Sequence, residues 1–255
     1  MSYASKYTSD LNKEGFEKSM VAFRRRQILQ IFSRYNPKNI VEVGCGTEPI
    51  FCWYNECKTI RIIERSKEFC EIALSELNRL KNLDHEYSKM NISIMNTSFE
   101  DCHDLGSNID FVVLSSILHE VDDVEIFLHH LRTLLSGGEH LYINVPNANS
   151  LHRLIAYHSG MIHNPAEISE RGDFFETKRV FTFEQLAELV DLCGFHIVDH
   201  GTVALKPFTH SQMDKVFDQE NNDNDKLFDG LFYSDKIISG IGSEIWMIIK
   251  VNGAV

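Results

Sequence analysis

The chain has 255 residues, 43% of them hydrophobic and 24% charged, which is typical of a globular protein with a full core. Its formal net charge of -12 disfavours non-specific binding to nucleic acid or anionic membrane, because both are polyanions. The sequence has neither an apolar run near the ~20 residues that cross a bilayer nor a signal-peptide core, so we expect a cytoplasmic protein without a nucleic-acid or membrane partner.

Helical and strand-like patterns alternate through the first half of the chain. Residues 14–34 carry apolar side chains at helical spacing, which predicts a first helix. The apolar runs that predict strands are Ile40–Val43, Thr59–Ile63, Ile92–Met95, Phe111–Leu114 and Leu141–Val145. Helical patterns lie at residues 49–57, 67–80 and 123–135. This alternation predicts an α/β fold whose parallel sheet is covered by helices on both faces.

The alternation stops after Pro146. Residues 147–181 are rich in polar and aromatic side chains, which favours a substrate-side or lid insertion. A helix at 182–193 ends at Gly194, and strands follow near 196–204 and 245–250. Residues 206–240 between these two strands are predicted to form a second insertion of the same kind. We therefore expect one domain over residues 1–255.

A glycine turn, Gly44-Cys45-Gly46, follows the first predicted strand. Glycine lets the backbone approach a ligand where a side chain would collide. Glu42 precedes this turn, and Glu64 ends the second strand, where a carboxylate can accept both ribose hydroxyls of a nucleoside. The alternative interpretation is that both acids are ordinary carboxylates at strand ends.

The turn does not fit a dinucleotide. The G-x-G-x-x-G pattern would need glycine at position 49, which is Pro49, and Glu42 would place negative charge near a pyrophosphate. A carboxylate suits a ligand that carries an ammonium group and a sulfonium. The sequence therefore favours S-adenosyl-L-methionine, with S-adenosyl-L-homocysteine as product, over a nicotinamide cofactor.

Four segments resemble the class I S-adenosylmethionine-dependent methyltransferases. They are VEVGCG (41–46), SFEDC (98–102), IDFVVLSSILHEVDD (109–123) and LLSGGEHLYINVPN (134–147). The resemblance implies a Rossmann-like, doubly wound, mostly parallel seven-stranded sheet with its cofactor-binding core at residues 39–147. The cofactor-binding residues that it implies are Glu42, Gly44, Cys45, Gly46, Glu64, Arg65, Phe99, Glu100 and Ser115. Phe99 would cover the adenine ring.

The chain departs from the family pattern at two positions. Glu48 stands where the first motif usually has its third glycine, and His119 precedes Glu120 where relatives often carry the acid first. The first departure would either shift the turn or place a carboxylate near the methionine part of the cofactor. The second leaves the role of His119 open.

The second half is similar to a subgroup of bacterial small-molecule methyltransferases. The similar segments are residues 144–162, 169–195 and 204–213. This subgroup is associated with sugars, surface polysaccharides or lipid-linked precursors. The resemblance implies methyl transfer, favoured to oxygen, on a sugar, phosphate or phosphoramidate group of a surface-polysaccharide or capsule precursor.

Histidine and basic residues supply the candidates for acceptor chemistry. His119, His152 and His163 are candidate bases for a hydroxyl acceptor, since histidine titrates near neutral pH. An acceptor that is already anionic needs cationic groups instead. Candidate substrate-binding residues are Asn147, Arg153, Arg171 and Arg179. The run Arg24-Arg25-Arg26 predicts a solvated helix face, with a phosphate contact as the alternative.

Several alternatives remain open from the sequence. One alternative is a domain that binds the cofactor without turnover. Another is a methyltransferase that acts on another metabolite, a protein or RNA. The six cysteines have no C-x-x-C pair, which favours free thiols over disulfides or a zinc site, and no metal is expected. The expected partner is a small-molecule acceptor, and the chain would be a monomer or a homodimer.

Overall fold

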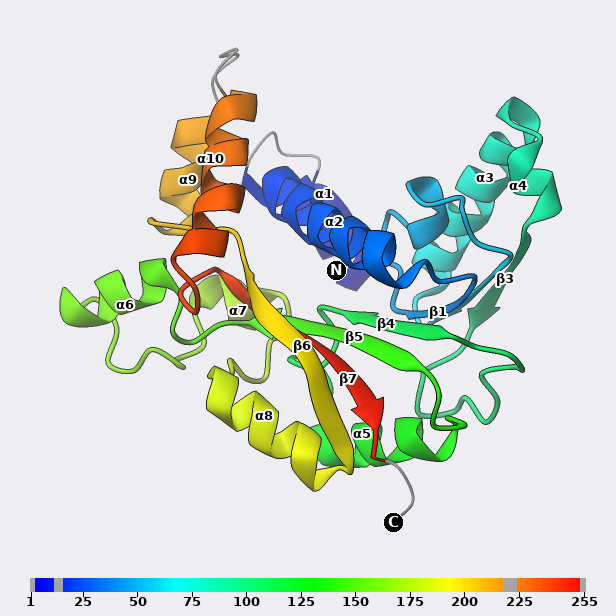
Figure 1. Ribbon diagram of the computed structural model, residues 1–255. Helices are drawn as coiled ribbons and strands as arrows, with labels where there is room; N and C mark the ends of the chain where they lie inside the picture. The colour runs from blue at the N-terminus through cyan, green and yellow to red at the C-terminus, as the bar shows by residue number, and fades with distance from the viewer. Residues whose placement is uncertain (1–2, 12–15, 218–223, 253–255) are drawn as a thin grey trace.

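A seven-stranded sheet forms the centre of the molecule. The structure, a computed structural model, describes residues 3–11, 16–217 and 224–252. The strands are β1 (Asn39–Val43), β2 (Thr59–Glu64), β3 (Asn91–Asn96), β4 (Phe111–Ser115), β5 (His140–Pro146), β6 (Phe195–Val203) and β7 (Glu244–Val251). Their order is β3-β2-β1-β4-β5-β7-β6, and β7 runs antiparallel to β5 and β6 (Figure 1). This confirms the predicted mostly parallel seven-stranded sheet.

Helices cover both faces of the sheet. Figure 1 shows α2 (Phe16–Tyr35) and α3 (Lys67–Leu83) on one face, and α5 (Val124–Thr133) and α8 (Phe183–Leu192) on the other. Ile40 packs in the cluster of the first face and its neighbour Val41 in that of the second, since successive strand residues point to opposite sides. A sheet buried on both faces needs continuous apolar strands, which explains the runs seen in the sequence.

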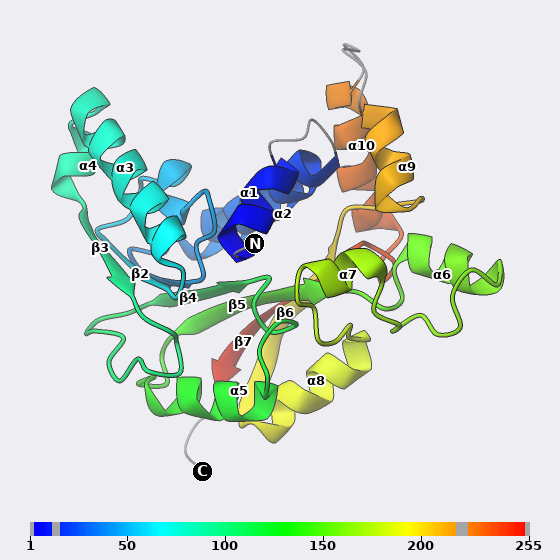
Figure 2. The same ribbon diagram turned by 180° about the vertical axis from the view of Figure 1, so that it is seen from behind.

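The other helices lie mostly beyond the carboxyl end of β5. They are α6 (Leu151–His158), α7 (Glu170–Phe174), α9 (His210–Phe217) and α10 (Asn224–Ile237), and both ribbon views place them there (Figures 1 and 2). Residues 147–181 thus contain α6 and α7, and residues 206–240 contain α9 and α10. The short α1 (Tyr3–Leu11) lies beside α2, and α4 (Glu86–Lys89) precedes β3.

Two local features differ from the sequence prediction. The prediction of a helix at 49–57 is wrong, because residues Ile50–Cys52 form only one 3-10 turn. The Glu42 carboxylate accepts the N–H of Ile50 at 3.0 Å, and Trp53 then leaves the helical conformation with φ -139°. Helix α1 was not predicted from its sequence, since its order depends on tertiary contacts such as those of Tyr3 and Tyr7 with Phe69.

All six cysteines are free thiols. None of the helices in the described part of the chain combines the length and apolar character that a bilayer span requires.

Candidate functional site

The glycine turn at the carboxyl end of β1 has a backbone that few other residues adopt. Gly44 has φ 74° and Gly46 has φ 55°, both in the left-handed region. A Cβ on Gly44 would collide with the Ile117 side chain. Glycine is therefore required at Gly44 both by the backbone conformation and by the packing of Ile117, and the turn lines a cavity with Gly44, Cys45 and Gly46.

Two buried carboxyl groups flank this turn. Glu64 accepts the Cys45 N–H at 3.0 Å and the Ser66 N–H at 2.7 Å, which fixes the carboxylate beside the turn. Glu42 is buried, and its burial, together with the charge of Glu64, raises its pKa to about 8. A cationic ligand would relieve the cost of ionising Glu42, so the turn fits a ligand with an ammonium group.

The turn opens into a cavity of about 410 Å³, a size typical of small-molecule sites. All nine predicted cofactor residues line it: Glu42, Gly44, Cys45, Gly46, Glu64, Arg65, Phe99, Glu100 and Ser115. A second group of lining residues, which we call the charged end, is linked by hydrogen bonds and by charge: Glu17, Arg24, His152, Arg171, Lys206 and Glu244. The cavity thus has two chemically different ends.

The structure does not bring all the predicted acceptor residues to the cavity. His119, His152, Arg153 and Arg171 line it. Asn147, Arg179 and His163 do not. The Asn147 amide donates to the Gly240 and Gly242 carbonyls, the Arg179 guanidinium donates to the Asp122 carbonyl, and His163 is exposed. Their roles in substrate binding and catalysis stay predictions.

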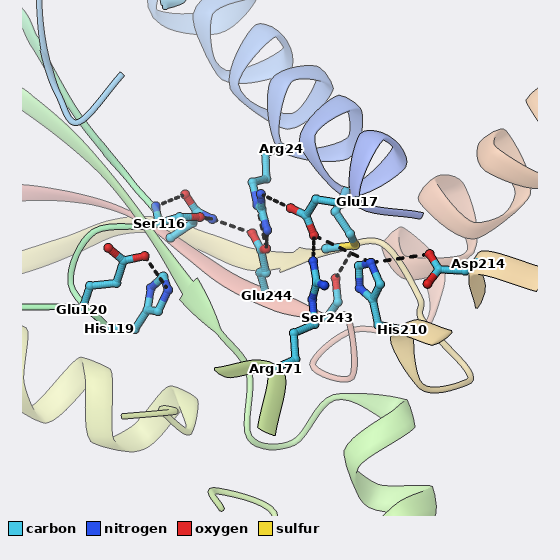
Figure 3. A network of polar contacts seen from close by, with 12 residues as sticks. Glu17, Arg24, Ser116, His119, Glu120, Arg171, His210, Asp214, Ser243 and Glu244 are labelled. Atoms are coloured by element: carbon cyan, nitrogen blue, oxygen red, sulfur yellow. Dashed lines mark hydrogen bonds and ion pairs between the residues drawn. The ribbon is translucent and has the colours of Figure 1, made fainter. Parts of the chain in front are cut away.

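A partly buried network of charges organises the charged end (Figure 3). Arg24 donates through Nε to Glu244 at 2.7 Å and through Nη1 to Glu17 at 3.3 Å. Arg171 donates to the other oxygen of Glu17 at 2.9 Å, and Asn144 donates to Glu244 at 2.5 Å. The sequence analysis named Arg24 only within the arginine run and missed Glu17 and Glu244, since β7 lies far from α2 in the chain.

The arginine run in α2 has three different environments. Arg24 is partly buried and pairs with Glu244 and Glu17, Arg25 pairs with Glu48, and Arg26 pairs with Asp229 at 2.5 Å. The interpretation as one solvated helix face is therefore wrong for Arg24. Consecutive residues on a helix point about 100° apart, so a run of one residue type need not share one environment.

His119 lies beside Glu120 in the cavity wall. Its Nε2 is 3.7 Å from Glu120 Oε1, which also accepts the Tyr3 hydroxyl at 2.7 Å. Burial lowers the pKa of His119 to about 3 and that of His152 to about 2, so both are neutral and weakly basic at pH 7. Burial raises the pKa of Glu120 to about 7. The sequence analysis noted Glu120 only for its position after His119. The pKa of Glu120 is better matched than those of His119 and His152 to proton transfer near neutral pH.

Comparisons with known proteins agree with this geometry. A family model described as "Methyltransferase domain" matches residues 20–200, whereas curated proteins give no match. The chain is similar to magnesium protoporphyrin IX methyltransferase from Synechocystis PCC 6803 with bound SAH, with 10% identity, 92% of this chain and 86% of that chain covered, and a TM-score of 0.58.

Two N-methyltransferase structures are also similar. A possible histamine N-methyltransferase from Thermotoga maritima has 17% identity, with 98% of this chain and 99% of that chain covered and a TM-score of 0.55. The N-methyltransferase NodS from Bradyrhizobium japonicum WM9, in complex with S-adenosyl-L-homocysteine, has 14% identity, with 96% and 91% covered and a TM-score of 0.52. At these identities the likeness concerns the fold.

The family model covers more than half of the chain, and the site has the groups that a methyltransferase cofactor requires. Gly44 and Gly46 shape the turn with their positive φ, and Glu42 and Glu64 present buried carboxyl groups beside it. These features fit S-adenosyl-L-methionine, the cofactor predicted from the sequence. The chain belongs to the methyltransferase domain family.

Proposed function

We propose that the protein transfers the methyl group of S-adenosyl-L-methionine to a small-molecule acceptor. One observation carries the proposal: a single cavity joins the turn flanked by Glu42 and Glu64 to a separate charged end. The first end suits the cofactor and the second suits an acceptor. Joining both in one cavity would let the two reactants meet away from bulk water.

At the cofactor end, two acidic side chains and one aromatic side chain would bind S-adenosyl-L-methionine. S-adenosyl-L-methionine supplies, when bound, an electrophilic methyl group on a sulfonium. Glu64 would accept the ribose hydroxyls, and Glu42 would pair with the ammonium group. Phe99 is buried in the wall and would cover the adenine, with Glu100 beside it.

The acceptor end would position the acceptor and, where needed, remove its proton. A hydroxyl acceptor needs a base, and Glu120 is the better match because burial raises its pKa to about 7 while the pKa of His119 falls to about 3. An acceptor oxygen that is already anionic needs no base. Catalysis would then rest on positioning and on exclusion of water.

We favour an oxygen acceptor in a sugar, phosphate or phosphoramidate group of a surface-polysaccharide or capsule precursor. The resemblance of residues 144–162, 169–195 and 204–213 supports this choice, as do the basic side chains of the charged end. The protein would work in the cytoplasm as a monomer or homodimer. Cofactor binding without turnover is the alternative.

Calorimetry with S-adenosyl-L-homocysteine tests the cofactor assignment. We expect saturable binding to the wild type and binding weakened at least ~10-fold, or ~1.4 kcal/mol, in Glu64→Gln. Glu71→Gln, an exposed change on α3, is the matched control and should bind like the wild type. Equal affinity in all three proteins would contradict the role given to Glu64.

Turnover then separates an enzyme from a binding domain. The protein is incubated with S-adenosyl-L-methionine and a panel of sugar and phosphorylated acceptors, and formation of S-adenosyl-L-homocysteine is measured. Acceptor-dependent product supports methyl transfer. Binding of the cofactor with no product from any class of acceptor would favour the alternative.

A further inference from the structure

The charged end of the cavity has more basic than acidic side chains. Arg24, Arg171 and Lys206 line it, with Arg153 beside them, against the carboxylates of Glu17 and Glu244. This excess of positive charge occurs in a chain whose formal net charge is -12. A local charge of the opposite sign to the whole protein indicates a ligand-specific site.

The two carboxylates already form hydrogen-bonded ion pairs with the arginines. Glu244 accepts from Arg24 at 2.7 Å and from Asn144 at 2.5 Å. Glu17 accepts from Arg24 at 3.3 Å and from Arg171 at 2.9 Å (Figure 3). Both carboxylates also act through space on Lys206, but their ion pairs are made with the arginines.

Arg153 is also held in place. Its guanidinium donates to the Pro165 carbonyl at 2.7 Å and to the Glu167 carbonyl at 2.8 Å. These two bonds fix the loop after α6 without neutralising the positive charge, since carbonyl oxygens are not ionised. The charge of Arg153 therefore still contributes to the potential at the cavity.

Lys206 follows β6 and is 9% exposed. Its Nζ lies 5.8 Å from the centre of the Phe16 ring, and no described carboxylate oxygen lies within 4 Å of it. Burial lowers the pKa of Lys206 to about 8, so the ammonium group is still mostly charged at pH 7. Glu17 and Glu244 favour the charged form from a distance, but a buried cation without a direct ion pair is costly, which favours an anion from outside the chain.

His152 supplies a second unused polar group at the same place. Its Nδ1 is buried and has no hydrogen-bond partner among the described residues. The nearby positive charge of Lys206 adds to burial in keeping the imidazole neutral. A neutral imidazole still has one N–H to donate, and an ammonium group has three.

We propose that Lys206 and His152 form a subsite for an anionic oxygen group, a carboxylate or a phosphate, on the methyl acceptor. The proposal rests on the proposed function, because it describes the acceptor of that reaction. A neutral hydroxyl or carbonyl would accept a hydrogen bond but leave the charge of Lys206 uncompensated. The subsite therefore selects acidic acceptors over neutral ones.

Anion titration of the protein saturated with S-adenosyl-L-homocysteine tests the subsite. Sodium phosphate and sodium acetate are titrated separately at pH 7 and constant ionic strength, and binding is followed by calorimetry and by thermal melting. We compare the wild type with Lys206→Met, which keeps the length of the side chain but not its charge. Lys215→Met, an exposed change on α9, is the matched control.

We expect saturable anion binding to the wild type and to Lys215→Met, and binding weakened at least ~10-fold in Lys206→Met. Lys206→Met should also melt at a higher temperature than the wild type in a chloride buffer without phosphate or acetate, because the substitution removes a buried charge that has no direct ion pair. Binding of phosphate alone would identify a phosphate-bearing acceptor, and binding of acetate as well would include carboxylates.

Two results would overturn the subsite. One is the absence of saturable binding of either anion to the wild type, which needs no variant to fold. The other is equal anion affinity in all three proteins. The affinity for S-adenosyl-L-homocysteine is measured beforehand for each protein, so a failed cofactor assignment is recognised separately from a failed anion subsite.

Discussion

The carboxyl group of Glu42 makes the ligand-free protein less stable as the pH rises. Its ordinary pKa is 4.5, and burial raises it to about 8 in the folded protein. Between these values the unfolded chain releases a proton that the folded protein retains, so the free energy of unfolding falls with rising pH. Below this range both states hold the proton and the effect vanishes.

Replacing Glu42 with glutamine removes this titration. At 1.36 kcal/mol per pH unit, the difference between the ordinary pKa and pH 7 amounts to about 3 kcal/mol. We therefore expect Glu42→Gln to be about 3 kcal/mol more stable than the wild type at pH 7, and less than ~1 kcal/mol more stable at pH 5. In a protein of this size the gain at pH 7 corresponds to a Tm increase of about 6–12 °C.

The same change should weaken cofactor binding. Glutamine cannot pair with an ammonium group as a charge, so the affinity for S-adenosyl-L-homocysteine should fall about 10-fold. Thermal melting at pH 5 and pH 7 and calorimetry at pH 7 measure both effects, with Glu71→Gln as the control. A stability difference that is the same at both pH values, or an unchanged affinity, would refute the reasoning.

Two further substitutions test the turn and the charge network. Gly44→Ala places a Cβ on a backbone with φ 74° and should lower the affinity for S-adenosyl-L-homocysteine by more than ~10-fold in calorimetry. Gly138→Ala has open space around it and should bind normally. Arg24→Met leaves the partly buried carboxylate of Glu17 and the buried carboxylate of Glu244 without their shared cation and should cost about 3 kcal/mol in urea denaturation. Arg34→Met, from an exposed pair, should cost no more than about 1 kcal/mol, and equal losses in the two arginine variants would contradict the burial argument.

The strands could be predicted because each is a short apolar run between polar turns. The first predicted strand, Ile40–Val43, matches β1 to within one residue, and Phe111–Leu114 matches β4 equally well. Burial on both faces selects apolar residues directly, so this signal is local. The helix predicted at 49–57 is only one 3-10 turn, because Trp53 leaves the helical conformation directly after it.

Site residues that lie close together in the sequence could be predicted, and those that only the fold brings together could not. The turn and its acids lie within one β-α-β segment, so Glu42, Gly44 and Glu64 could be found from spacing alone. Glu17 and Glu244 could not, because only the folded chain brings α2 and β7 together around Arg24. The burial that separates the pKa of Glu120 from that of His119 is likewise a property of the fold.

The two ends of the cavity draw on different parts of the chain. The family model covers residues 20–200, which include the whole glycine turn, Glu42 and Glu64. Glu17, Lys206 and Glu244 lie outside that range, yet all three line the charged end. Family membership therefore accounts for the cofactor and leaves the acceptor open. The acceptor must be sought through the residues at either side of the shared core, and among the described residues Lys206 is a buried cation there without a carboxylate oxygen within 4 Å.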